Sequence, residues 1–216
     1  MRTIGVCVAL ALAVTQVALA EAPVVRFSAS DQAAARAAVV TPADLGSTWK
    51  GAIEKNAKPL EAENCPGLWE PRQSDLVITG VAKSNFSGNG AQIESAVQVY
   101  KTARMAELDW SRSVSAAGLA CMRQHAAADK TPGVRFISIA RSPFPRVGEQ
   151  TIRFRMIAEV TSAAGAAPLR MLIDVVLLGR GRTGISFSLM VPYQLRAGAD
   201  AFEVRLARAL NSRIRV

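Results

Sequence analysis

Alternation of apolar and polar residues is densest between residues 150 and 191. Three runs there, QTIRFRMIAEV, PLRMLIDVVLL and TGISFSLMV, show the two-residue period of β-strands and are separated by short breaks that contain glycine. We predict two successive hairpins, the first with Ala164 and Gly165 at its tip and the second with a three-residue loop from Arg180 to Arg182.

The tip of the first hairpin fixes a register. It places Arg155 opposite Asp174 and Glu159 opposite Arg170, so one face carries two structural ion pairs. The other face pairs apolar residues: Ile152 with Leu177, Phe154 with Val175, and Met156 with Ile173. A slip by one residue would destroy both sets, which favours this register. The predicted second loop places Ser186 beside Val176 and Ser188 beside Asp174, on the more polar face.

The remaining segments complete an α+β pattern. Residues 77–86 and 91–100 read as a hairpin and 134–140 as a further strand, whereas 51–76 reads as an irregular surface loop. Helical periodicity appears over residues 31–39, 102–127 and 199–214. The expected fold is an antiparallel sheet of about five to six strands, packed with two long helices and a short N-terminal helix.

Residues 1–20 read as an export signal, with Arg2 before an apolar run and small residues at 18–20 before Glu21. A membrane anchor is the alternative, but the apolar run is short for a bilayer. The expected product is a single domain over residues 21–216, secreted or periplasmic, without a transmembrane segment. Cys65 and Cys121 are then expected to form one disulfide, the alternative being two buried thiols.

Positive charge is concentrated late in the chain. Residues 132–216 hold 13 arginines, no lysine and 5 acidic residues, within a formal net charge of +9. Such an excess either binds anions or reflects composition alone. Because Arg155 and Arg170 have predicted partners, Arg153, Arg180 and Arg182 are left as the unpaired candidates for binding.

The residues offer no catalytic or metal-binding motif. His125 is the single histidine, and no nucleophile elbow lies near it. The run GRGRTG leads from one predicted strand into another, so it is a hairpin turn and not a nucleotide fingerprint. No cofactor, metal or catalytic residue is predicted. Paired carboxylates can be distant in sequence, so a hydrolase with an unrecognised acidic site stays an alternative.

Several short motifs together resemble the extracellular sensor domain of PknH-type mycobacterial receptor kinases and related secreted or lipid-anchored actinobacterial proteins. The resemblance covers nearly all of residues 21–216 and rests on TPADLGSTW (41–49), Cys65, a helix ending near Cys121, PRVGEQTIRFR (145–155), LLGRGRTG (177–184) and the closing helix. It implies an antiparallel sheet packed with helices, a ligand cleft and no catalytic residues. The kinase domains typically have two disulfides where this chain has one candidate.

The sequence thus favours a non-catalytic, sensor-like binding domain of the cell envelope, with its ligand cleft between sheet and helices. A lipid, a glycan or an envelope protein is the expected partner, rather than a nucleic acid. Two alternatives stay open: the hydrolase, and electrostatic binding of anionic lipid or polymer through the C-terminal arginines.

Overall fold

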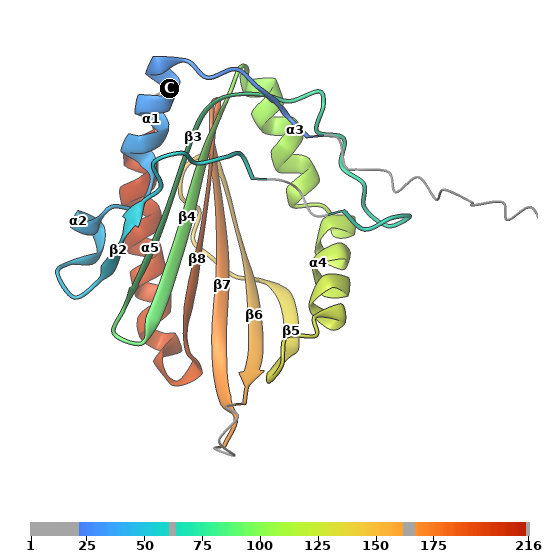
Figure 1. Ribbon diagram of the computed structural model, residues 1–216, viewed down its shortest axis with the longest axis vertical. Coiled ribbons are helices and arrows are strands. Elements are labelled where there is room, and N and C mark those ends of the chain that lie inside the picture. The colour runs from blue at the N-terminus through green and yellow to red at the C-terminus, as the bar shows by residue number, and fades with distance from the viewer. Residues whose placement is uncertain (1–21, 61–63, 162–166, 215–216) are drawn as a thin grey trace, which may run out of the picture.

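The computed structural model describes residues 22–60, 64–161 and 167–214, and within them one eight-stranded sheet carries helices on both faces (Figure 1). Its order is β1-β3-β4-β8-β7-β6-β5, and β2 also pairs with β3. Neighbouring strands are antiparallel apart from β1, which is parallel to β3. The strands are β1 (Val24–Val25), β2 (Lys50–Ile53), β3 (Val77–Gly88), β4 (Ala91–Tyr100), β5 (Val134–Ser142), β6 (Gln150–Val160), β7 (Leu169–Arg180) and β8 (Thr183–Pro192).

The helices mostly follow the predicted periodicity. They are α1 (Ala29–Ala38), α2 (Pro42–Leu45), α3 (Ala103–Ser113), α4 (Ala116–Ala128) and α5 (Arg196–Ser212), with a 3-10 turn, η1 (Tyr193–Leu195), before α5. The N-terminal helix starts earlier than predicted because Ser28 is its cap: the Ser28 hydroxyl accepts the Asp31 N–H at 3.2 Å.

Two features of the predicted architecture are wrong. The sheet is larger than five to six strands, since β1 and β2 are too short for their alternation to stand out in the sequence. The single helix predicted over 102–127 is two helices, because Ser115 caps a new one by accepting the Gly118 N–H at 2.9 Å. The predicted export signal and the tip at Ala164 and Gly165 lie outside the described residues.

The register of the first hairpin is confirmed along its described length. Arg155 faces Asp174, Glu159 faces Arg170, and the three predicted apolar pairs lie opposite one another. The ion pairs form as well, with the Arg155 Nη2 to Asp174 Oδ2 distance at 2.5 Å and the Arg170 Nε to Glu159 Oε1 distance at 3.5 Å.

The second hairpin differs from its prediction by one residue. Arg180 pairs with Thr183, so the loop has two residues, and Gly181 takes a positive φ of 54° in it. A two-residue loop with glycine first is the pattern of a type II′ turn. The slip moves Ser186 opposite Leu177 and Ser188 opposite Val175, onto the apolar face of β7. The two serines therefore share a face with apolar side chains, contrary to the prediction.

The two faces of the sheet are covered differently. On one face, called the closed face, α1 contacts β3 and β4 while α5 contacts β7 and β8, around a continuous apolar core (Figure 1). On the other, called the open face, α3 contacts β4 and β8 and α4 contacts β5. The 54–76 connection also contributes to the open face, through Leu60, Trp69 and Gln73. The open face carries three adjoining cavities, and a further hollow lies beside α1 and the β7–β8 turn.

Candidate functional site

Three adjoining cavities lie on the open face, and the side chain of Leu60 borders all of them. The apolar cavity, of about 230 Å³, has Val175 and Leu177 of the sheet on one side and Trp69 on the other. The inner cavity, of about 90 Å³, lies beneath α3 beside Trp110. The polar cavity, of about 350 Å³, lies over β3, β4 and β8. Together they form a cleft between the sheet and its helices.

Leu60 is fixed in the centre of this cleft by its own backbone. Its N–H donates to Oε1 of Gln98 on β4 at 2.7 Å, while its side chain stays 41% exposed. The exposed Leu60 side chain is therefore held in place by its backbone. An apolar ligand in the cleft would contact this side chain, because the contact removes apolar surface of both from water. The cleft is therefore subdivided by a defined residue.

A chain of hydrogen bonds lines the inner cavity. Gln98 Nε2 donates to the Tyr100 hydroxyl at 2.8 Å, and this hydroxyl donates to Asp109 Oδ2 at 2.5 Å. Burial raises the pKa of Asp109, although the Tyr100 hydrogen bond opposes the rise, and burial also raises the pKa of Tyr100 well above its ordinary value. The polar groups of this wall are thus satisfied internally, and they fix α3 against β4.

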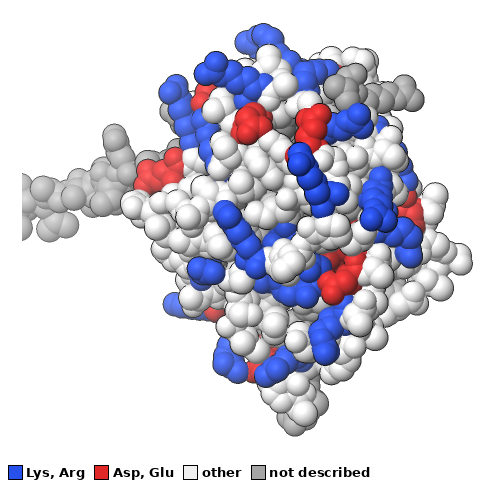
Figure 2. Space-filling view, turned by 180° about the vertical axis from the view of Figure 1, so that it is seen from behind, with Lys and Arg blue, Asp and Glu red and all other residues white. Residues whose placement is uncertain are grey.

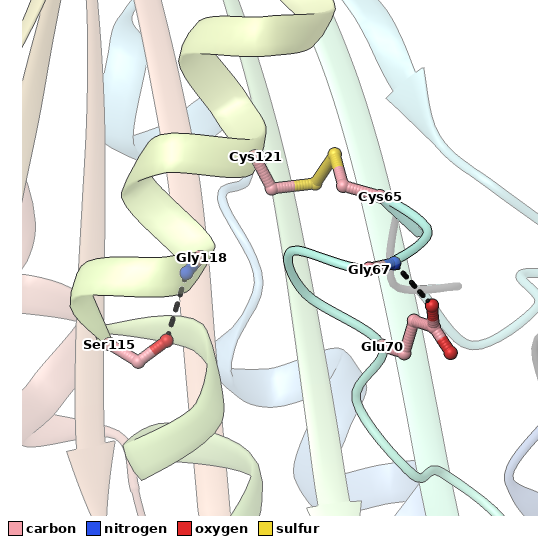
Figure 3. The surroundings of a disulfide bond; sticks show 6 residues. All are labelled: Cys65, Gly67, Glu70, Ser115, Gly118 and Cys121. Carbon is pink, nitrogen blue, oxygen red and sulfur yellow. Dashed lines mark hydrogen bonds between the residues drawn. A yellow bond between two sulfur atoms is a disulfide. The ribbon is translucent and has the colours of Figure 1, made fainter.

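The outer wall is cross-linked at two points. Arg112 of α3 makes a bidentate pair with Asp75, at 2.8 and 2.7 Å. The predicted disulfide is present: Cys65 and Cys121 are bonded with their Cα atoms 5.6 Å apart, which ties the 54–76 connection to α4 (Figure 3). Beside it, the Gly67 N–H donates to Glu70 at 2.6 Å (Figure 3). The cleft is therefore bounded by covalently and ionically fixed elements.

Arg153 lies away from this cleft, on the closed face. We expected it to be unpaired, but its side chain is 7% exposed and contacts Asp200 Oδ1 at 2.5 Å and Glu203 Oε2 at 3.0 Å. The Phe144 ring lies 5.3 Å from its guanidinium carbon. The prediction of a free charge at this position is wrong because α5 supplies partners that are distant in sequence.

Arg153 belongs to a buried ion cluster that also contains Arg155, Asp174, Asp200 and Glu203. Asp174 and Glu203 are fully buried. Burial, reinforced by the neighbouring Asp174 carboxylate, raises the pKa of Glu203 to about 8, so Glu203 keeps its proton to a higher pH than an exposed glutamate does. Burial also raises the pKa of Asp200, but hydrogen bonds from Arg153 and Arg155 outweigh it and the pKa is lowered.

The three acidic side chains of the cluster come within 4.8 Å of one another, as a cation site would require. Arg153 and Arg155 already supply their counter-charges, which makes the arrangement a structural ion network rather than a metal centre. Cys65, Cys121 and His125 also lie close together, but both sulfur atoms are committed to the disulfide.

The other predicted binding arginines lie at the β7–β8 turn. Arg182 was expected to be unpaired, but it binds Asp31 at 2.9 Å and donates to the Tyr100 carbonyl at 2.9 Å. Arg180 is half-buried at the end of β7. Farther along, Arg213 pairs with Asp44. Figure 2 shows basic side chains spread over the face seen there, with acidic ones between them. The arginine excess therefore does not gather into one patch on this face.

No helix among the described residues is long and apolar enough to cross a membrane. Comparison with family models and with curated proteins found no match. Among solved structures, the chain is similar to the extracellular domain of PknH from Mycobacterium tuberculosis, at 13% identity and a TM-score of 0.46, covering 84% of this chain and 96% of that one.

A second similar structure is an uncharacterised protein of Mycobacterium smegmatis, the Rv0999 ortholog, at 11% identity and a TM-score of 0.47, covering 84% and 98%. The resemblance to PknH-type sensor domains that the sequence motifs indicated is thus also found among solved structures.

Proposed function

We propose that the protein is an exported, non-catalytic binding domain whose ligand occupies the cleft on the open face. The observation that carries this proposal is that the two faces of the sheet are covered differently. On the closed face α1 and α5 cover a continuous core, and a hollow of about 830 Å³ lies beside α1 and the β7–β8 turn. On the open face, half-buried strand residues line three adjoining cavities that reach down to the sheet between β3 and β7. Concave, largely apolar sites with a few fixed polar groups are where small ligands bind.

The proposed export is supported by the disulfide, since such bonds persist in oxidising compartments. The absence of catalysis is supported by the acidic groups of the cleft: in the polar cavity Glu94 accepts hydrogen bonds from Asn85 and Gln92, and Glu54 is exposed. Among the described residues that line the apolar and inner cavities, Asp109 is the one carboxylate, and it accepts the Tyr100 hydrogen bond. A paired-carboxylate mechanism would need a second such group there.

Filling the apolar cavity tests the proposal. Leu177 lines both the apolar and the inner cavity, so Leu177→Trp should occupy the space that a ligand needs. The probe is 1-anilinonaphthalene-8-sulfonate, excited directly so that the added tryptophan does not contribute. We expect at least about tenfold weaker binding, the loss of roughly 1.4 kcal/mol of contact.

The matched control is Leu195→Trp, which adds the same side chain at an exposed position before α5. It should bind the probe like the unsubstituted protein. If both variants fold with unchanged circular dichroism and bind the probe equally well, the cleft is not the binding site and the proposal is wrong.

A further inference from the structure

Polarity changes along the open face in the same direction in two neighbouring cross-strand rows. The first row carries Lys83, Ala96, Ser186, Leu177 and Ile152, on β3, β4, β8, β7 and β6 in that order. The second row, on the same strands, reads Asn85, Glu94, Ser188, Val175 and Phe154. Both rows are predominantly polar as far as β8 and apolar from β7 onward. The face therefore has a hydrophilic half and an apolar half.

The cavities on these two halves adjoin. Val175 and Leu60 border both the polar and the apolar cavity. Met122 of α4 then borders both the apolar cavity and an outer groove that runs past Phe136 and Met156. The hollows thus follow one another from the polar cavity, over β7, to an outer groove that has α4 on one side and β5 and β6 on the other. Their arrangement suits an elongated ligand with chemically different ends.

The charges at the hydrophilic end select among possible head groups. Glu54 and Glu94 line the polar cavity together with a single cation, Lys83, so the formal balance there is negative. An anionic head would be repelled. Ser186 and Ser188 are half-buried, and within the described part of the chain neither hydroxyl has a hydrogen-bond partner. Hydroxyls, amides and carboxylates of this kind match a head rich in hydroxyl groups.

We propose that the ligand is an uncharged amphiphile, with a hydroxyl-rich head such as a sugar in the polar cavity and an alkyl chain in the apolar cavity and outer groove. This inference rests on the proposed function of the cleft and adds the ligand's chemical class and direction. The head lies over β8, β4 and β3, and the chain crosses β7 toward β6 and α4.

Head-group exchange on the full chain tests the class of ligand. The probes are dodecyl maltoside, dodecyl sulfate with the same chain and an anionic head, and maltose without a chain. All are titrated calorimetrically below their micelle-forming concentrations. Dodecyl maltoside should bind at least about tenfold more tightly than either of the others, and shortening its chain should weaken binding about fourfold per methylene.

A pair of serine variants tests the direction. Ser186→Val with Ser188→Val removes both hydroxyls from the polar cavity while keeping residues that favour strands. It should weaken the binding of dodecyl maltoside about tenfold and leave the binding of 1-anilinonaphthalene-8-sulfonate unchanged. Ser138→Val, on an exposed position of β5, is the matched control and should change neither.

The results separate this inference from the proposed function. Dodecyl sulfate binding as tightly as dodecyl maltoside, or a double serine variant that binds the maltoside normally, would overturn the inference. The cleft would remain a binding site if Leu177→Trp still weakens the naphthalene probe. Failure of the Leu177→Trp test would remove the proposed function and this inference together.

Discussion

Glu203 shows how α5 determines the ionisation of a single side chain. Its Oε2 accepts from Arg153 at 3.0 Å, whereas its buried Oε1 has no hydrogen-bond partner among the described residues. A proton is therefore best placed on Oε1. The folded state binds a proton that the unfolded chain releases at ordinary carboxyl pKa, and this makes stability depend on pH.

We expect the free energy of unfolding to fall as the pH rises from about 5 to about 8. The unfolded chain loses the Glu203 proton near pKa 4.5, while the folded protein keeps it up to a pKa of about 8. One proton of difference corresponds to roughly 1.4 kcal/mol per pH unit. Glu203→Gln is neutral at every pH, so its slope should be flatter in urea unfolding across this window.

Glu54→Gln is the control for this pH dependence, because Glu54 is exposed on the opposite face. It should keep the slope of the unsubstituted protein. A Glu203→Gln variant whose stability falls with pH as steeply as that of Glu54→Gln would show that Glu203 is not the titrating group.

In the ion cluster, one partner of an arginine could be predicted from the sequence and the others could not. Arg155 opposite Asp174 follows from strand register alone, since both lie in one hairpin. The partners of Arg153 do not follow from register: Asp200 and Glu203 belong to α5, and their approach depends on how that helix is rotated over the sheet. Helical periodicity predicts which side of α5 faces inward but not which strand residue it meets.

α1 packs so closely against β3 that position 80 of the strand must be glycine. A Cβ atom at Gly80 would overlap the Asp31 carbonyl of α1. Next to it, the Val81 N–H donates to Gln32 Oε1 at 2.7 Å, which anchors the helix at this irregularity of the strand. Glycine at position 80 is thus set by the distance between helix and strand.

Gly80→Ala should therefore destabilise the protein by about 1–3 kcal/mol, the usual cost of forcing an atom into a packed contact. Gly198→Ala makes the same change in α5, where a Cβ would meet no atom within 4 Å. It should be neutral or stabilise by up to about 1 kcal/mol, because alanine favours helix. Thermal unfolding of both variants is the measurement, and equal effects would contradict the proposed helix–strand contact.

Elements with strong patterns were predictable, and those that depend on small signals were not. The first hairpin and α5 follow from alternation and helical spacing. The β7–β8 turn was predicted one residue too long, although glycine at the first of two central positions was a usable signal for the shorter turn. That error hid the serines of the polar cavity and, with them, the mixed polarity of the open face.

At the scale of the whole molecule, the two faces of the sheet are covered differently, and the disulfide cross-links the outer wall of the open face. Cys65 and Cys121 are 56 positions apart in the chain, and the bond between them joins the 54–76 connection to α4 across the outer wall of the cleft. Removing the bond should therefore affect both global stability and the cleft.

We expect Cys65→Ser with Cys121→Ser to lower the free energy of unfolding by roughly 4 kcal/mol in the chain-entropy model. Binding of 1-anilinonaphthalene-8-sulfonate should weaken as well, because the two walls lose their link. Urea midpoints and probe titrations measure the two effects. Dithiothreitol should shift the midpoint of the unsubstituted protein and not that of the double variant; an unshifted midpoint would show that the bond does not stabilise the fold.

The strand order also imposes a sequence of events on folding. β8 lies between β4 and β7, so it joins the β3–β4 hairpin to the β5–β7 meander. Until residues 183–192 have been synthesised, β4 and β7 each present an unpaired edge, the kind of surface that recruits other chains. Arg153 and Asp174 likewise face water until α5 follows. A nascent chain can therefore complete neither its sheet nor its charged interior before β8 and α5 are available, which makes closure after the other strands a property of this topology.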